Sequence, residues 1–291
     1  MKLRGTYTAL VTPFKNGKVD EEAYAKFIEW QIKEGVSGVV PCGTTGESAT
    51  LSFEEHEKVI KLCIEVVNKR VPVIAGTGAN STEEAIKLSL DAKKAGADYL
   101  LLVAPYYNKP SQEGIFQHYK AIASAVDVPQ ILYNVPGRTA VDMSIETIGR
   151  LSKIDNIVGI KDAHGDLTRA IKIRRVVPDT FSVMSGEDGT IAAFLAHGGD
   201  ACISVTSNIA PSLCAQLHKA WWARDLDTFA KIRDTLAPVH EAMFCETNPC
   251  PVKYAASLIC GFESSVRLPL WEITDASKEK VKEAMKQAGL I

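Results

Sequence analysis

Ile157-Val158-Gly159-Ile160-Lys161-Asp162 is a short apolar run that ends on two charged residues. A run of this length and composition is typical of a central strand in a parallel sheet, where both faces are covered. Lysine is almost never fully buried without a purpose, and a desolvated amine at the end of such a strand is a nucleophile for carbonyl carbons. The alternative interpretation is that Lys161 reaches the surface or pairs with Asp162.

Strand and helix patterns alternate on both sides of this stretch. Ser52 and Ser81 each begin an S-x-x-E capping box that opens a helix. About eight β-α units fill residues 1–224, which predicts a TIM (β/α)8 barrel that carries the active site. Residues 225–291 show only helical patterns, and we expect this C-terminal α-helical region to make subunit contacts. The other predicted strands are residues 6–11, 38–41, 71–76, 99–104, 130–134, 181–185 and 201–204.

An open, doubly wound sheet is the alternative architecture, and it would carry a nucleotide or phosphate fingerprint at its switch point. Gly76-Thr77-Gly78 follows a strand but lacks a third glycine at the fingerprint spacing. Gly43-Thr44-Thr45-Gly46-Glu47 is not a phosphate-binding P-loop, because no Gly-Lys-Ser/Thr follows it. The barrel is therefore favoured.

The composition is that of an ordinary globular protein, and it excludes several classes of function. Of the 291 residues, 46% are hydrophobic and 23% are charged, and the formal net charge of −2 indicates no nucleic-acid surface. The apolar runs are too short for a transmembrane helix, and Met1-Lys2-Leu3-Arg4-Gly5 lacks the apolar core of a signal peptide. Scattered cysteines without a C-x-x-C pair favour a reducing, cytoplasmic location. The histidines lack metal-ligand spacing, so we predict no metal.

Polar side chains collect where the predicted strands end, which is where chemistry is found in (β/α)8 barrels. This asymmetry favours a catalytic role for Lys161. A lysine amine that adds to a ketone gives an imine, an electron sink that permits C–C bonds to form or break. Such a site requires a proton shuttle, a carboxylate clamp and oxyanion donors. The strand-end residues are Thr44, Thr45, Glu47, Thr77, Asn80, Tyr106, Tyr107, Asn108, Tyr133, Asn134, Arg138, Lys161, Ser185, Gly186, Glu187 and Ser204.

Each of these partner residues also has a simpler interpretation. Tyr133 ends the neighbouring strand and is within reach of a group on Lys161, or it is a belt tyrosine with a solvated hydroxyl. Thr44 and Thr45 hold a carboxylate through their hydroxyl and backbone N–H groups, or they only cap the loop. Arg138 binds a carboxylate in a bidentate manner, or it forms a surface ion pair.

At these residues the chain resembles the pyruvate-dependent class I aldolases of the dihydrodipicolinate synthase and N-acetylneuraminate lyase superfamily. The matching motifs are Gly43-Thr44-Thr45-Gly46-Glu47, Tyr133-Asn134-Val135-Pro136 and Gly159-Ile160-Lys161-Asp162, and the resemblance runs from about Gly5 to the C-terminus. An arginine at position 138 resembles the dihydrodipicolinate synthases, because sialate lyases usually lack an arginine at this place. Residues 106–112 and 248–253 point to the same subfamily.

The resemblance implies a lyase of diaminopimelate and lysine biosynthesis that condenses pyruvate with L-aspartate 4-semialdehyde. It implies that Lys161 forms an imine with pyruvate, so that no cofactor is required. Tyr133, Thr44 and Tyr107 would form a proton relay, with Tyr107 supplied across a dimer interface within a homotetramer, a dimer of dimers. Thr45 would hold the pyruvate carboxylate, Arg138 would hold the semialdehyde carboxylate, and Gly186 and Ile203 would lie around the imine.

Many members of the family are inhibited by L-lysine at a dimer interface, and this chain matches much of that site. Phe53 departs from it, because sensitive enzymes often carry histidine there, and Asp162 replaces the more usual glutamate after the lysine. Two alternatives stay open, a related pyruvate aldolase acting on sialic acid or a keto-deoxy sugar acid, and a non-catalytic barrel that binds a metabolite. The matching allosteric residues are Ser48, Ala49, His56, Asn80, Glu84 and Tyr106.

Overall fold

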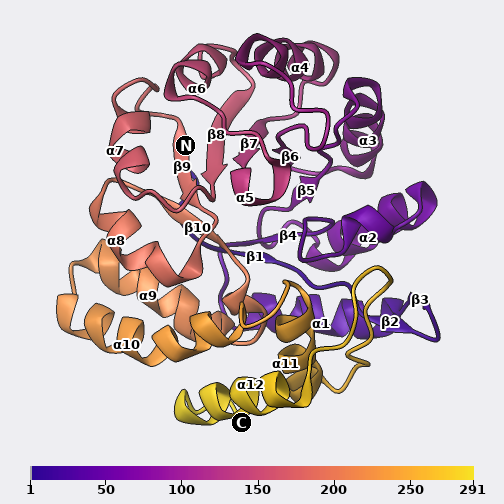
Figure 1. Cartoon of the computed structure of the whole chain (residues 1–291), viewed down its shortest axis with the longest axis vertical. Helices are drawn as coiled ribbons and strands as arrows, with labels where there is room; N and C mark the ends of the chain where they lie inside the picture. Colours follow the sequence, from indigo (N-terminus) through magenta and orange to yellow (C-terminus); the bar gives the residue numbers. More distant parts are fainter. Residues whose placement is uncertain (1) are drawn as a thin grey trace. The chain divides into compact units, whose positions relative to one another are not determined.

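The structure is a computed structural model that describes residues 2–291. The chain divides into two compact units (Figure 1). The first combines the N-terminal residues up to Arg4 with Pro72–Ile203, and the second combines Gly5–Val71 with Ser204–Ile291. The boundary predicted at residue 224 stays a prediction.

The first unit is built from parallel strands that follow one another in chain order. They are β5 (Ile74–Gly76), β6 (Tyr99–Val103), β7 (Gln130–Asn134), β8 (Ile157–Asp162), β9 (Ser182–Ser185) and β10 (Ala201–Ser204). Connections between neighbouring parallel strands need a crossover, and helices supply it here. These helices are α3 (Thr82–Ala95), α4 (Gln112–Ala125), α6 (Ile145–Leu151), α7 (Thr168–Arg174) and α8 (Ile191–Ala196).

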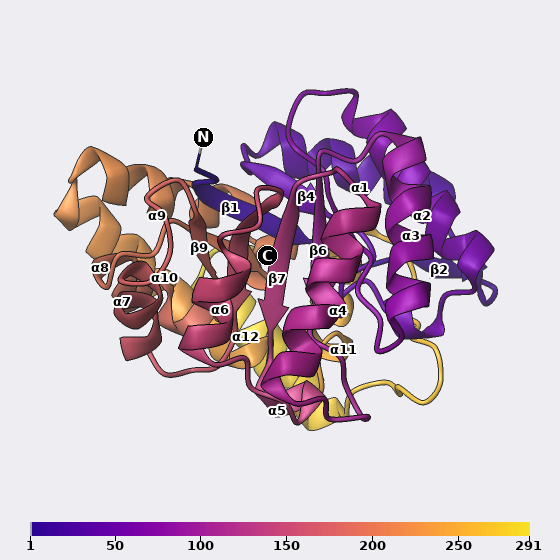
Figure 2. The same ribbon diagram turned by 90° about the horizontal axis from the view of Figure 1, so that it is seen from above.

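The crossover helices of this unit cover the outer side of its strands. Figures 1 and 2 show α4 and α6 on the same side of β7, and α4 packs on both α3 and α6. The strands are buried on both faces, as the apolar run of residues 157–160 predicted. A short extra helix, α5 (Pro136–Thr139), begins directly beyond the end of β7 and was not among the predicted elements.

The register of β7 against β8 decides which side chains share a face. Tyr133 lies opposite Lys161, and Asn134 lies opposite Asp162. Because side chains alternate between the two faces of a strand, Tyr133 and Lys161 point to one face while Asn134 and Asp162 point to the other. The polar residues at these strand ends therefore form two separate groups.

The second unit pairs β1 (Gly5–Ala9) with β4 (Gly38–Val40) in parallel and carries the helices α1 (Glu21–Lys33) and α2 (Phe53–Val67). The capping box predicted at the start of α2 is confirmed, because Ser52 and Glu55 bond each other's backbone N–H groups. Residues 14–19, which lie outside the predicted strands, form a small antiparallel hairpin of β2 (Phe14–Lys15) and β3 (Lys18–Val19).

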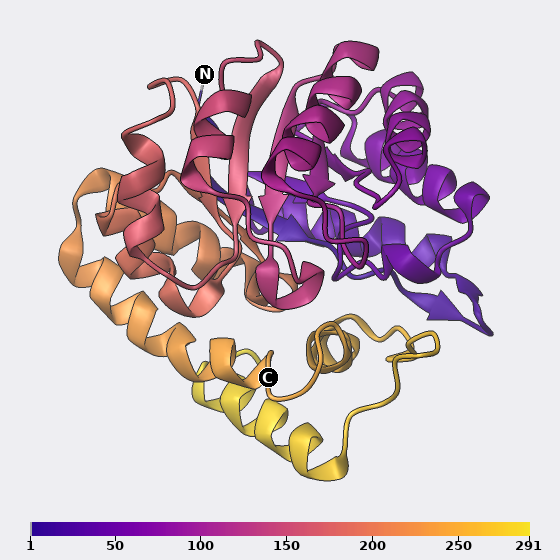
Figure 3. The ribbon, with the colours of Figure 1, turned by 45° about the horizontal axis from the view of Figure 1, so that its top comes forward.

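Helices dominate the C-terminal part of the second unit, as the sequence predicted. They are α9 (Pro211–Ala223), α10 (Leu226–Ala242), α11 (Cys250–Cys260) and α12 (Asp275–Gln287). Figure 3 shows α10 and α12 side by side, and α9 packs on α10 while α11 packs on α12. No helix within residues 2–291 is both long and apolar enough to cross a membrane.

His218 on α9 makes the fold sensitive to acid. Its ring is 3% exposed, and neither ring nitrogen has a hydrogen-bond partner within residues 2–291. Burial lowers the pKa of His218 to about 4 from an ordinary 6.5. Between these values the unfolded chain binds a proton that the folded chain does not, so stability falls as the pH drops from 6.5 towards 4.

We expect His218→Leu to lose this acid sensitivity. From pH 7 to pH 5 the buried neutral imidazole costs the native protein about 2 kcal/mol, since each unit of pKa shift corresponds to about 1.36 kcal/mol. Urea unfolding at pH 7 and pH 5 measures how far the free energy of unfolding drops in each protein. This drop should be about 2 kcal/mol smaller in His218→Leu than in the wild type. An unchanged pH dependence in His218→Leu contradicts the assignment, and the half-buried His197 supplies a matched His197→Leu control.

Candidate active site

Lys161 stands at the end of β8 with its side chain inside the protein. The residue is 6% exposed, and its Nζ lies 4.2 Å from the centroid of the Tyr133 ring. The ring belongs to the neighbouring strand and is brought there by the register that pairs the two residues. An amine held against an aromatic face and shielded from water is placed to react with a small carbonyl compound. The structure thus brings together the two residues on which the sequence prediction most depended.

Gly186, directly after β9, leaves space beside this amine. A Cβ at this position would lie 2.9 Å from Lys161 Cε and 2.6 Å from the Cβ of Ala163. Such distances are shorter than real Cβ contacts, so any other residue would displace the lysine side chain. Ile203, the other predicted neighbour of the imine, is fully buried in β10, one residue after Cys202, which pairs with Ser185.

A carboxyl group near Lys161 was not assigned a role from the sequence. Burial raises the pKa of Glu187 above its usual range, and the Asp188 carboxylate adds to this effect. The charges of Lys161 and Arg138 act in the opposite direction, which places both cations within electrostatic range of Glu187. Its position after Ser185-Gly186 at a strand end was the available signal, because strand-end carboxyls in barrels often serve the site.

Arg138 is carried by the short helix α5. Val135 O accepts the Arg138 N–H at 2.9 Å, and Pro136 occupies the first turn, where its missing N–H costs nothing. Ala140 ends the helix in a left-handed conformation, with φ of 57°. The Arg138 side chain is exposed, on a rigid turn at the same end of the strands as Lys161. An exposed guanidinium on a fixed turn suits the binding of a free carboxylate.

The second unit holds the loop of Thr44 and Thr45, which follows β4. Gly43 O accepts the N–H of Gly46 at 3.1 Å, and Thr44 O accepts the N–H of Glu47 at 3.1 Å. Thr45 is 3% exposed, and its Oγ1 accepts a hydrogen bond from Asn248 Nδ2 at 3.2 Å. The loop is therefore tight, with one threonine buried and the other, Thr44, half-buried.

A buried ion pair anchors the end of this loop to the C-terminal helices. Lys253 Nζ lies 2.6 Å from Glu47 Oε1, and both side chains are 0% exposed. Glu47 Oε2 accepts the backbone N–H of Arg267 at 2.9 Å, and the Lys253 ammonium lies 3.9 Å from the centroid of the Phe14 ring. The sequence prediction gave neither residue this role.

The predicted lysine-site residues fall into two groups, one in each unit. In the first unit Asn80 Nδ2 donates to Tyr106 O at 3.2 Å, while burial and the Glu84 carboxylate raise the pKa of Tyr106. Tyr107, beside them, is 89% exposed. In the second unit Ser48 and Ala49 form the short helix η1 (Ser48–Thr50), and His56 is buried on α2.

Residues 2–291 contain no group of three or more histidine, cysteine, aspartate or glutamate side chains that could hold a metal ion. The side chains described above at the strand ends offer amine, hydroxyl, guanidinium and carboxyl groups. These groups suit imine formation at Lys161, with the exposed Arg138 guanidinium carried by the helix that follows the neighbouring strand.

Comparisons with known proteins identify the family to which this chain belongs. The model of the dihydrodipicolinate synthetase family matches residues 2–288. A 4-hydroxy-tetrahydrodipicolinate synthase of Rhodospirillum centenum is 56% identical over 288 residues, with 99% of each chain covered. One of Bradyrhizobium diazoefficiens is 52% identical over 290 residues, with 100% of this chain and 98% of the relative covered.

Solved structures extend the likeness to three dimensions. A dihydrodipicolinate synthase of Acinetobacter baumannii, complexed with pyruvate, has a TM-score of 0.97 at 48% identity, with 100% of each chain covered. One from Cyanidioschyzon merolae, with lysine bound, has a TM-score of 0.95 at 37% identity, with 99% of each chain covered. A third, from Methylacidiphilum fumariolicum, has a TM-score of 0.97. The predicted fold class, a TIM (β/α)8 barrel with a C-terminal helical extension, is confirmed by this likeness.

Proposed function

Because this chain belongs to the dihydrodipicolinate synthetase family, we propose that Lys161 forms an imine with pyruvate and so drives its condensation with L-aspartate 4-semialdehyde. The chain is an enzyme, a lyase of diaminopimelate and lysine biosynthesis with the function of a 4-hydroxy-tetrahydrodipicolinate synthase. The observation that carries the mechanism is the buried amine of Lys161 held against the Tyr133 ring.

In the proposed reaction the amine of Lys161 first attacks the ketone carbon of pyruvate, and the ketone oxygen leaves as water. The imine draws electrons from the adjacent methyl group, so that a proton leaves and an enamine forms. The enamine carbon attacks the aldehyde of the second substrate, and the aldehyde oxygen takes up a proton. The substrate amine then attacks the imine carbon, closes the ring and releases Lys161. No cofactor enters this sequence.

Proton transfer is assigned to Tyr133, Thr44 and Tyr107, with Tyr107 reaching the site of a neighbouring subunit. The position of Tyr133 beside the amine supports its part. The 89% exposure of Tyr107 leaves its ring accessible to a neighbouring subunit, as this role requires. Thr45 is proposed to hold the pyruvate carboxylate, and Gly186 and Ile203 to shape the space around the imine.

Arg138 is proposed to bind the carboxylate of the semialdehyde. We expect Arg138→Ala to leave imine formation with pyruvate intact and to lower kcat/KM for the semialdehyde about 10²-fold, since a charge-assisted bidentate contact is lost. The measurement is steady-state kinetics with each substrate varied in turn. The exposed Arg224 allows an Arg224→Ala control with the same loss of charge. Unchanged turnover of the semialdehyde in Arg138→Ala would remove Arg138 from the site.

Substrate choice tests the proposed function as a whole. The purified enzyme should consume pyruvate and L-aspartate 4-semialdehyde together, and it should leave N-acetylneuraminate and keto-deoxy sugar acids uncleaved. Faster cleavage of a sugar acid would instead identify another pyruvate aldolase of the superfamily. Absence of turnover with every substrate, together with pyruvate binding, would identify a non-catalytic metabolite-binding barrel.

Regulation and assembly are further parts of the proposal. We infer a homotetramer, a dimer of dimers, that L-lysine inhibits through Ser48, Ala49, His56, Asn80, Glu84 and Tyr106. The hydrogen bond from Asn80 to Tyr106 O, and the Glu84 charge that raises the pKa of Tyr106, support a site in the first unit. A cytoplasmic location is proposed as well, because all seven cysteines are free thiols, and thiols persist in a reducing compartment.

A further inference from the structure

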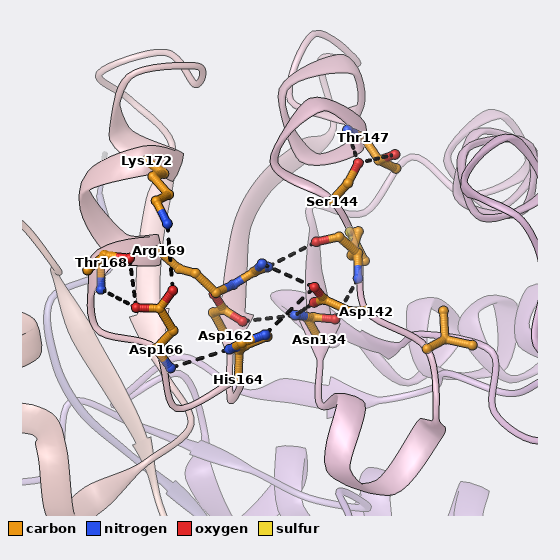
Figure 4. Close-up of polar contacts among 12 residues, drawn as sticks. Asn134, Asp142, Ser144, Thr147, Asp162, His164, Asp166, Thr168, Arg169 and Lys172 are labelled. Carbon is orange, nitrogen blue, oxygen red and sulfur yellow. Dashed lines mark hydrogen bonds and ion pairs between the residues drawn. The ribbon is translucent and has the colours of Figure 1, made fainter.

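Asn134 and Asp162 directly follow Tyr133 and Lys161, and they join the ends of β7 and β8 on the face opposite the amine. Asn134 Nδ2 donates to Asp162 Oδ1 at 3.0 Å, and the two residues are 0% and 5% exposed (Figure 4). A buried polar bond between neighbouring strand ends fixes their spacing, because either group left unpaired would be costly. The residues behind Tyr133 and Lys161 are thus tied directly to each other.

Arg169 on α7 extends this tie to a segment beyond β7. The residue is 6% exposed, and its Nε donates to Asp162 Oδ2 at 2.8 Å. Its Nη2 donates to Met143 O at 2.9 Å, and its Nη1 lies 3.3 Å from Asp142 Oδ2 (Figure 4). One guanidinium therefore holds the end of β8 and residues 142–143 in a fixed relation. Its planar fork suits three such contacts at once.

Asn134 closes a loop with the same segment. Its Nδ2 also donates to Asp142 Oδ1 at 2.9 Å, and its Oδ1 accepts the backbone N–H of Met143 at 3.0 Å. Residues 135–141 thus begin directly after Asn134 and return to its side chain at residues 142–143. This closed loop contains α5 and Arg138. The position of Arg138 relative to Lys161 is therefore set in part by the side chains of Asn134, Asp162 and Arg169.

We propose that Arg169 is a positioning residue that places Arg138 for the carboxylate of the second substrate. This inference rests on the proposed function of Arg138. A misplacement of about 1 Å far from the chemistry can cost about 10²-fold in rate, so a small movement of the closed loop is sufficient. Pyruvate would be affected far less, because Lys161 and Tyr133 are also held by the hydrogen bonds of their own strands.

The test replaces Arg169 with methionine and follows each substrate separately. Arg169→Met should raise KM for the semialdehyde about tenfold or more, and KM for pyruvate should change less than about threefold. Borohydride trapping of the pyruvate imine should proceed at close to the wild-type rate. The control is Arg150→Met, which removes a half-exposed arginine on α6 that pairs with Glu113 and should change neither KM. Equal rises in both KM values, or none, overturn the proposal.

A double-mutant cycle separates positioning from a general structural role. If Arg169 acts through Arg138, then Arg169→Met should have little further effect on kcat/KM for the semialdehyde in the Arg138→Ala background. If instead the fold-losses in kcat/KM of the two single variants multiply in the double variant, the proposal is overturned. Asp142→Ala removes a half-exposed carboxylate that pairs with Arg169. This variant should also raise KM for the semialdehyde more than KM for pyruvate, and it provides the test even where Arg169→Met folds poorly. The proposed function is tested separately, by measuring turnover of the semialdehyde by the wild-type enzyme before any variant is made. If the wild-type enzyme does not turn over the semialdehyde, the proposed function itself is refuted.

Discussion

Lys161→Met should fold like the wild type and lose condensation activity by about 10⁴-fold or more. Methionine fills the same buried space and still contacts the Tyr133 ring, but it cannot form an imine. A loss of this size corresponds to about 5 kcal/mol of transition-state stabilisation, at about 1.36 kcal/mol for each factor of ten. Steady-state kinetics with both substrates measure it, and urea unfolding shows whether the variant is folded.

Lys153→Met is the matched control, because Lys153 is an exposed lysine that comes before β8. It should retain wild-type turnover. If Lys161→Met retained more than about one hundredth of the activity, covalent catalysis by this amine would be excluded.

Lys253→Met should destabilise the second unit by about 3–5 kcal/mol. The substitution leaves the Glu47 carboxylate buried without its ammonium partner, and breaking a buried pair on one side carries a cost of this size. Burial lowers the pKa of Lys253 to about 8, although the Glu47 carboxylate opposes that shift. The Glu47 carboxylate thus favours the charged form of Lys253, and burial opposes it.

The same substitution should weaken pyruvate binding, because Glu47 ends the loop of Thr44 and Thr45. The free energy of unfolding from urea titration and KM for pyruvate are the two measurements. A Glu47→Gln/Lys253→Met double variant should recover part of the stability, since neither charge is then left unpaired. A Lys26→Met control removes an exposed lysine that pairs with Glu22 and should leave stability unchanged. Wild-type stability in Lys253→Met would contradict the account of the buried pair.

The sequence predicted the main elements well because their signals are local and repeated. The apolar run of residues 157–160 and the capping box at Ser52 correspond to β8 and α2. The hairpin of residues 14–19 was missed, since each of its strands is two residues long and Gly17 indicates only a turn. The helix α5 was missed for a similar reason, because Pro136-Gly137 is typical of a turn and equally of a first helical turn.

Parts of the candidate site depend on contacts that no local pattern reports. The ends of two neighbouring strands were enough to predict Tyr133 within reach of Lys161, whereas the register that pairs the two residues is seen only in the structure. Nothing near Glu47 indicates that its partner is Lys253, 206 residues further along the chain. Arg169 is seven residues after Asp162, and only the turn between β8 and α7 returns its side chain to that carboxylate. Such pairs follow from tertiary packing, so they become visible only in the folded chain.

Borohydride trapping tests the central claim most directly. The enzyme is incubated with pyruvate, reduced, digested and analysed by mass spectrometry, with Lys161→Met treated in parallel. The account predicts one adduct of the mass of a reduced pyruvyl group, on the peptide that contains Lys161, and none in the variant. Failure to trap an adduct, or an adduct on another lysine, would contradict it.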